Sequence, residues 1–253
     1  MKELEVVNGQ YKVRYHDFPG EKTPILFIHG LGCAGSLDYP EVAAQPELCG
    51  HRRIIIDLLG AGFSDKPTQF DYTIENHALY LIEFIKALRL EKIILFGHSI
   101  GGAVALTIAS LYKGDIENII LTEANLDSGG GFVTKKIASM TLNEFVNTGF
   151  KNIIMENLQS SNEIWVSSFS LWLPQAAYQI SKSVVTGQLP SWRTILYSLD
   201  CPKTYIFGEY NLDDPDVDIL KNNNVRIDTV SKAGHSMSWE NPKGLANAIK
   251  KSL

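Results

Sequence analysis

One serine of the chain lies in a pattern suited to nucleophilic chemistry. Residues 97–101 read Gly-His-Ser-Ile-Gly, a G-x-S-x-G pattern centred on Ser99. The apolar residues 93–96 before it predict a strand, and residues 103–112 after it predict a helix. A serine on such a sharp turn stands above the sheet edge, and its neighbours must be small because other backbone passes close by. The helix start below it favours developing negative charge. The pattern therefore predicts a nucleophile at Ser99.

A serine hydroxyl becomes a good nucleophile when a base takes its proton, so a histidine must lie within hydrogen-bond reach. Of the six histidines, His235 is the candidate base. It lies in a glycine-containing loop, residues 233–236, between a predicted strand at 225–230 and the predicted last helix. His98, inside the serine turn, is expected to face packing or backbone. Three further histidines lack any supporting context, namely His16, His51 and His77.

Glu123 is one candidate for the acid that orients His235. It follows the predicted strand 119–121. A helix of about 13 residues after Ser99 descends roughly 20 Å, and a strand of about seven residues climbs back roughly 23 Å. Glu123 is therefore expected at the same sheet edge as Ser99. Its alternative interpretation is a loop anchor for the glycine-rich turn at 128–131.

Short apolar runs recur along the chain and predict the sheet that must position these side chains. The runs cover residues 25–28, 54–56, 93–96, 119–121 and 205–207. Apolar strands without polar alternation are typical of a parallel sheet covered by helices on both faces.

Turn and cap residues predict elements at both ends of the chain. Residues 4–7 and 11–15 are rich in β-forming residues and flank the turn dipeptide Asn8-Gly9, so a hairpin is expected first. A one-sided apolar pattern predicts a helix over residues 74–88. The last helix is expected to begin at Asn241-Pro242, because Asn can cap a helix and Pro suits its first turn.

The strand rhythm disappears between residues 132 and 189. The segment contains helix-compatible runs that include Trp165 and Trp172. We therefore predict a helical cap insertion at residues 132–189 and a core formed by residues 1–131 and 190–253. The two tryptophans indicate an apolar binding pocket.

The serine turn with its strand and helix resembles that of the α/β-hydrolase fold family, and other landmarks of the family follow in order. Residues 29–32 read His-Gly-Leu-Gly, directly after a predicted strand, where the family carries its oxyanion loop. The resemblance implies that the backbone N–H groups of Leu31 and Ile100 are the oxyanion donors. Residues 57–64 resemble a D-x-x-G-x-G-x-S stretch of the family, which we assign to structure.

The resemblance supports His235 as the base and leaves two choices for the acid. After the strand 205–207 the family usually reads G-x-x-D, whereas residues 208–211 read Gly-Glu-Tyr-Asn. An amide cannot supply the negative charge that stabilises an imidazolium. The acid is therefore Asp213 or Asp214, or it is Glu123, since some relatives, haloalkane dehalogenases among them, carry a carboxylate at that place.

These features predict an α/β fold with a mostly parallel, doubly wound sheet, helices on both faces and the helical cap. The resemblance implies a serine hydrolase that cleaves an ester or similar small acyl substrate through an acyl-enzyme on Ser99. His29, Trp165 and Trp172 are expected in the pocket of this substrate, which we expect to carry an apolar part. The alternatives are a non-catalytic small-molecule receptor and a cofactor-free lyase or oxygenase with His235 as base.

Composition argues against several other classes. The chain has 253 residues, of which 45% are hydrophobic and 20% charged, as in globular proteins with a full core. The net charge of −5 argues against nucleic acid or an anionic membrane as partner. The uncharged residues 93–112 are not interpreted as a membrane span, because a glycine-containing turn interrupts them.

No cofactor or metal is predicted, and the expected location is the cytoplasm. The sequence has no metal-ligand spacing, phosphate loop or flavin pattern, and the acidic residues 213–218 lack the glycine of a calcium loop. Three cysteines are too few for a disulfide framework and fit a reducing compartment. Residues 1–7 contain no apolar signal segment.

Overall fold

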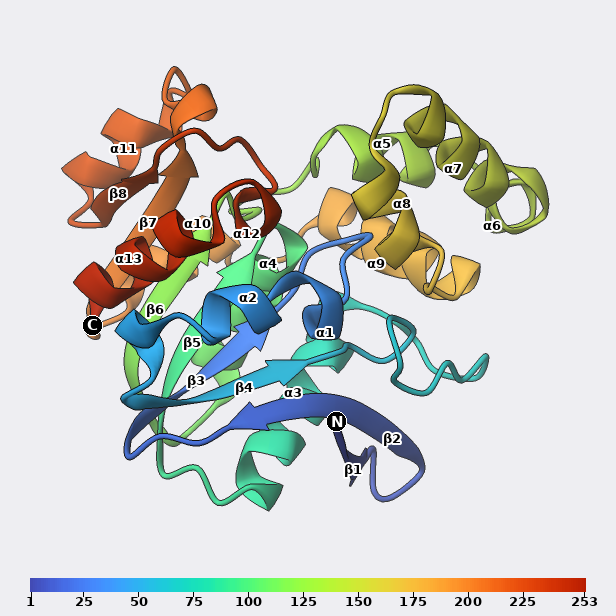
Figure 1. Ribbon diagram of the computed structural model, residues 1–253. Helices are drawn as coiled ribbons and strands as arrows, with labels where there is room; N and C mark the ends of the chain where they lie inside the picture. The colour runs from blue at the N-terminus through green and yellow to red at the C-terminus, as the bar shows by residue number, and fades with distance from the viewer.

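One eight-stranded sheet, with the strand order β1-β2-β4-β3-β5-β6-β7-β8, runs through the computed structural model, which describes residues 1–253 (Figure 1). Strands β3 to β8 are mutually parallel, and β2 is antiparallel to both β1 and β4. The strands are β1 (Lys2–Val6), β2 (Tyr11–Phe18), β3 (Lys22–Ile28), β4 (His51–Ile56), β5 (Lys92–His98), β6 (Asp115–Thr122), β7 (Lys203–Gly208) and β8 (Arg226–Val230). The predicted mostly parallel α/β sheet is confirmed.

Both faces of the sheet are buried, which explains its uninterrupted apolar strands. Successive side chains of a strand point to opposite faces. In β5, Ile93 and Leu95 belong to one apolar cluster and Ile94 and Phe96 to another, and all four are fully buried. Each strand must therefore be apolar at consecutive positions.

Helices cover the two faces as the doubly wound arrangement predicts. The layer next to Ile93 and Leu95 contains α3 (Ile74–Ala87), α4 (Ile100–Leu111), α10 (Trp192–Ser198) and α11 (Asp216–Asn222). The opposite layer contains α1 (Gly35–Asp38), α2 (Pro40–Ala43), the 3-10 turn η1 (Pro46–Leu48), α12 (Met237–Glu240) and α13 (Pro242–Ser252). None of the helices combines the length and apolar composition that a membrane crossing requires.

The expected hairpin is also present. β1 and β2 pair from Lys2 opposite Tyr15 to Val6 opposite Tyr11. In the turn between them, Asn8 has φ 55° and Gly9 has φ 81°, the left-handed conformation that this dipeptide tolerates.

The chain between β6 and β7 forms helices alone. They are α5 (Phe132–Ala138), α6 (Leu142–Glu144), the π-helical turn η2 (Phe145–Gly149), α7 (Phe150–Gln159), α8 (Glu163–Phe169), α9 (Pro174–Thr186) and α10. Helices α5 to α9 gather beyond the end of the sheet to which the arrowheads of β3 and β5 point, and α10 packs on α4 (Figure 1). Residues that follow the parallel strands therefore face this helical group.

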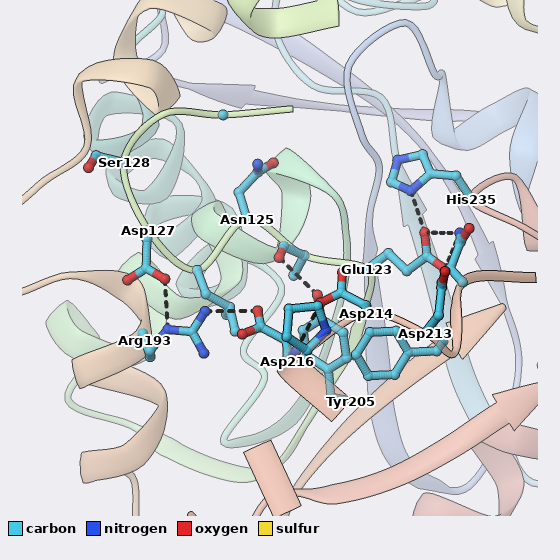
Figure 2. Close-up of a pocket in the computed structure, with 16 residues that line it drawn as sticks. Glu123, Asn125, Asp127, Ser128, Arg193, Tyr205, Asp213, Asp214, Asp216 and His235 are labelled. Carbon is cyan, nitrogen blue, oxygen red and sulfur yellow. Dashed lines mark hydrogen bonds and ion pairs between the residues drawn. The ribbon is translucent and has the colours of Figure 1, made fainter. Parts of the chain in front are cut away.

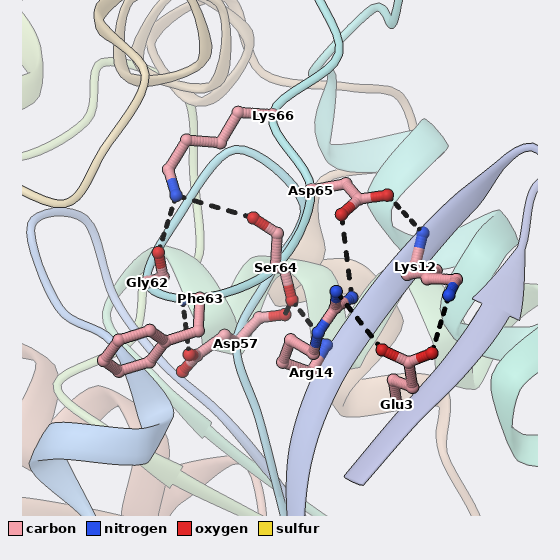
Figure 3. Close-up of polar contacts among 9 residues, drawn as sticks. All are labelled: Glu3, Lys12, Arg14, Asp57, Gly62, Phe63, Ser64, Asp65 and Lys66. Carbon is pink, nitrogen blue, oxygen red and sulfur yellow. Dashed lines mark hydrogen bonds and ion pairs between the residues drawn. The ribbon is translucent and has the colours of Figure 1, made fainter. Parts of the chain in front are cut away.

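The loop after β4 is held against β2 by polar contacts (Figure 3). Ser64 Oγ donates a 2.5 Å hydrogen bond to the carbonyl oxygen of Asp57 and accepts one of 2.8 Å from the backbone N–H of Arg14. The carboxylate of Asp57 accepts a hydrogen bond of 2.9 Å from the N–H of Phe63. These contacts give residues 57–64 a structural role.

Replacing Ser64 by alanine is expected to lower the free energy of unfolding by about 1–3 kcal/mol, because the Asp57 carbonyl loses its donor and the Arg14 N–H its acceptor. Urea denaturation followed by tryptophan fluorescence measures the change. Ser167→Ala is the control, since the Ser167 hydroxyl is exposed and bonds only within its own helix. Equal midpoints for the two variants would contradict the structural role.

Candidate active site

The turn at Ser99 joins β5 to α4 in a strained backbone conformation. Ser99 has φ 52° and ψ −122°, a region that costs non-glycine residues about 1–3 kcal/mol. Its N–H donates to the carbonyl of Thr122, and its own carbonyl accepts from the N–H groups of Gly102 and Asn125. Neighbouring backbone on β6 and its loop thus holds the turn.

The loop after β3 touches this turn directly. A Cβ atom built at Gly101 would lie 2.3 Å from the carbonyl oxygen of Ile28, so no larger residue fits there. One built at Gly30 would lie 3.1 Å from the Cβ of Ser99. The loop that contains Leu31 is consequently in contact with the serine.

His235 is paired with Glu123. Its Nδ1–H donates a 2.7 Å hydrogen bond to Glu123 Oε2. Glu123 follows the end of β6, and His235 lies in the loop between β8 and α12. No hydrogen bond joins His235 to Asp213 or Asp214, so of the candidate acids only Glu123 contacts the histidine.

Asn211 completes the surroundings of Glu123. Its amide nitrogen lies 2.8 and 3.0 Å from the two carboxylate oxygens, and the N–H of Gly208 donates a 2.9 Å bond to Oε1. Burial opposes ionisation of Glu123, but the hydrogen bonds from His235, Asn211 and Gly208 outweigh it and hold the pKa of the carboxyl below its ordinary value. Glu123 is therefore an anion at neutral pH.

Ser99 and His235 open into one cavity of about 360 Å³. Its apolar wall consists of Leu31, Phe132, Val133 and Trp165. No hydrogen bond joins Ser99 Oγ to His235 directly. Catalytic hydrogen bonds are often long in the absence of substrate and tighten in the complex. The arrangement can support proton transfer from a serine to a histidine in a partly apolar cavity.

Comparison with known proteins shows the family to which this fold belongs. A family model of the alpha/beta hydrolase fold matches residues 23–196. The chain belongs to the α/β-hydrolase fold family. The esterase from Thermogutta terrifontis, solved with malate bound, has the same fold, with a TM-score of 0.79 at 20% identity over 99% of this chain and 97% of that one.

Two curated relatives match part of the chain. The 2-hydroxy-6-oxo-2,4-heptadienoate hydrolase of Pseudomonas putida is 31% identical over 120 residues, which are 47% of this chain and 43% of the relative. Lipase 1 of Psychrobacter immobilis is 34% identical over 126 residues, which are 49% of this chain and 38% of the relative. The matched segments thus span less than half the length of these relatives.

In this α/β-hydrolase, His29 orients the loop that contains Leu31. The N–H of Leu58 donates to His29 Nε2 at 3.0 Å, so the ring proton is on Nδ1, which lies 2.9 Å from the carbonyl oxygen of Gly30. Burial lowers the pKa of His29, which keeps the ring neutral. Because the C=O and N–H of one peptide point in opposite directions, the N–H of Leu31 points away from His29.

The other expected oxyanion donor, Ile100, is the first residue of α4. The first N–H groups of a helix have no partner within the helix. Ile100 directly follows Ser99, and Leu31 lines the same cavity as Ser99. Both expected donors therefore adjoin the serine.

Two residues expected to contact substrate, His29 and Trp172, do not line the cavity of Ser99. His29 is fully buried behind the loop, where its ring is committed to Gly30 and Leu58. Trp172 is 3% exposed and donates its indole N–H to the carbonyl of Cys33 at 2.8 Å. Of the three, only Trp165 lines the cavity of Ser99.

His98 has the packing role expected of it. Its Nδ1 lies 3.0 Å from Thr122 Oγ1, and its ring centroid lies 4.6 Å from that of His235. Burial lowers the pKa of His98 to about 3, so a neutral ring packs against His235.

A second, polar cavity of about 610 Å³ adjoins the first and shares Glu123, Asn125 and His235 with it (Figure 2). Carboxylates line it, namely Asp127, Asp213, Asp214 and Asp216. Arg193 bonds to Asp127 at 2.7 Å and to Asp216 at 2.8 Å. No group of three or more potential ligand side chains is arranged to hold a metal ion.

The sequence pattern did not reveal the role of Asn211 beside Glu123. The clue in the sequence is the departure from the G-x-x-D pattern, because an amide stands where the family usually has the acid. In the structure this amide donates hydrogen bonds to the carboxylate of Glu123.

The Asn211→Leu variant is expected to raise the pKa of Glu123, because the carboxylate loses two hydrogen bonds that favour its charged form. Since the folded-state pKa is depressed in the wild type, the stability it contributes is present above the ordinary glutamate pKa and is lost as pH falls through the folded value. In the variant this contribution is smaller, and its loss is complete at a higher pH. Carboxyl ¹³C NMR titration measures the shift, with the exposed Asn147→Leu as control. An unchanged Glu123 titration would refute the assignment.

Proposed function

We propose that this α/β-hydrolase is a serine hydrolase that cleaves an ester or a similar small acyl compound through an acyl-enzyme on Ser99. One observation carries the proposal: Ser99, in a strained turn, opens into the same cavity as His235, whose Nδ1–H is bonded to the anionic Glu123. A nucleophile, a base and an acid that orients the base are the minimum set for acyl transfer.

The reaction follows from this arrangement. With its proton on Nδ1, His235 is free to accept the Ser99 proton on Nε2 as the serine oxygen attacks the substrate carbonyl carbon. The imidazolium is stabilised by Glu123. The N–H groups of Leu31 and Ile100 stabilise the oxyanion. His235 then returns the proton to the leaving group, and water attacks the acyl-enzyme in a second cycle of the same steps.

We propose residues 132–189 as a cap that supplies much of the substrate wall. Phe132 and Val133 of α5 and Trp165 of α8 line the cavity of Ser99. Their apolar surfaces favour an acyl group with apolar character, and a cavity of about 360 Å³ fits a small molecule.

A neutral substrate is favoured over an anionic one. The relative from Pseudomonas putida is named for a dienoate, which is a carboxylate. Four aspartates line the polar cavity, and Arg193 is the only arginine or lysine among its lining residues. These aspartates would repel a negatively charged substrate, so we infer an ester that carries no free carboxylate.

The Ser99→Ala variant is expected to abolish labelling by a fluorophosphonate and to lower turnover of p-nitrophenyl acetate by at least about 10⁴-fold, because the attacking oxygen is lost. Intact-protein mass and absorbance report the two signals. Ser139→Ala, which removes an exposed hydroxyl, serves as control. Retained turnover in Ser99→Ala would sink the proposal, and a wild type without labelling or turnover would favour the small-molecule receptor.

Moving the carboxylate gives a second test. Glu123→Gln is expected to lower kcat/KM by about 10³–10⁴-fold, as for loss of a triad acid. Adding Asn211→Asp to that variant is expected to restore at least about tenfold, because a negative charge returns next to the same hydrogen-bond network.

Asn223→Asp, which adds an equal charge on the exposed end of α11, is the matched control for this double variant. Wild-type activity in Glu123→Gln would exclude Glu123 as the acid and leave Asp213 or Asp214. Equal recovery with Asn223→Asp would show that the position of the charge is irrelevant.

A further inference from the structure

Three consecutive carbonyl groups after β3 accept hydrogen bonds from the helical segment that follows β6. Trp165 Nε1 donates to the carbonyl of Leu31 at 3.2 Å, and Ser168 Oγ donates to that of Gly32 at 2.6 Å. Trp172 makes the third bond, to Cys33. Residues 165–172 therefore hold the segment 31–33, which we call the oxyanion segment.

Apart from these bonds, a backbone hydrogen bond of 3.3 Å from the N–H of Cys33 to the carbonyl of Gly30 closes a turn at this segment. The segment belongs to no helix or strand, and Gly32 has φ +75°, which a glycine adopts without strain. A Cβ atom built there would lie 2.3 Å from the indole of Trp165. Because a glycine tolerates other backbone conformations, the orientation of the peptide planes beside Gly32 depends on such hydrogen bonds.

The hydrogen bonds to these carbonyl groups also fix the direction of the N–H groups in the same peptides. A peptide is planar, so a carbonyl held in one direction holds the N–H of the next residue in the opposite direction. His29 secures the Gly30–Leu31 peptide, and the helical segment secures the three peptides that follow. The N–H of Leu31 thus belongs to one anchored peptide, and the next peptide in the chain is anchored as well.

We propose that Ser168 is a positioning residue that, with the two indoles, keeps the Leu31 N–H directed at the substrate oxyanion. The inference rests on the proposed function. Ser168 is 1% exposed, makes the shortest of the three bonds and does not line the cavity of Ser99. Its hydroxyl acts through the backbone of Gly32 and does not touch substrate.

The Ser168→Ala variant isolates this role. Its kcat for p-nitrophenyl acetate is expected to fall about tenfold with KM within about twofold, because loss of a whole oxyanion donor costs about 10²–10³-fold and here the donor is only displaced. Affinity for phenylboronic acid, which forms a tetrahedral adduct on a serine, is expected to fall by a similar factor. A purely structural contact lowers the midpoint of thermal unfolding without this selective effect.

Ser170→Ala is the matched control on the same segment, because the Ser170 hydroxyl donates to the carbonyl of Val166 and does not reach the oxyanion segment. Trp172→Phe is the second variant and decides the matter if Ser168→Ala does not fold. It removes one indole N–H and keeps an aromatic ring beside His29. The same selective loss of kcat and boronate affinity is expected.

The outcomes separate this inference from the proposed function. Selective losses in Ser168→Ala or Trp172→Phe, with Ser170→Ala unchanged, support the positioning role. If the wild type turns over substrate, and Ser168→Ala and Trp172→Phe have the same kcat and boronate affinity as Ser170→Ala, the positioning role is overturned. The proposed serine hydrolase function is then unaffected. A wild type that neither turns over nor binds boronate contradicts the proposed function itself.

Discussion

The backbone at the end of β3 is in direct contact with the backbone of the turn that follows β5, and the other residues of the site are arranged around this contact. The carbonyl of Ile28 lies where a side chain at Gly101 would stand, so the start of α4 packs directly on the loop after β3. This contact brings the strained Ser99 next to the oxyanion segment. The order β3-β5-β6-β7-β8 then brings the loops after β6, β7 and β8 up in succession, and with them Glu123, Asn211 and His235.

Much of this arrangement can be predicted from the chain, because it depends on local rules. Apolar runs identify the parallel strands, and the G-x-S-x-G pattern between a strand and a helix identifies the turn at Ser99. The lengths of one helix and one strand lead to Glu123 at the same sheet edge. Those lengths do not give the direction of the side chains. The sequence therefore leaves Asp213 and Asp214 as alternative partners of His235, and the contact between Glu123 and His235 is found only in the structure.

The surroundings of the oxyanion segment lie beyond such reasoning. A buried indole needs an acceptor for its N–H, but nothing near Trp172 in sequence indicates that this acceptor is the carbonyl of Cys33. His29 likewise takes its proton arrangement from the N–H of Leu58, in the loop after β4. Residue type alone makes both side chains look like pocket residues, whereas their polar atoms are satisfied inside the protein.

The decisive contacts also join distant parts of the chain, and this has a consequence for folding. His235 and Glu123 are 112 residues apart, and Ser168 and Gly32 are 136 residues apart. Closing such long loops costs entropy before the contacts repay it. During synthesis the N-terminal part emerges first, so the residues of the turn at Ser99 are made before those of the loop of His235. A nascent or truncated chain that lacks this loop therefore contains Ser99 without its proposed base, and the proposed pair forms only after residue 235 has been made.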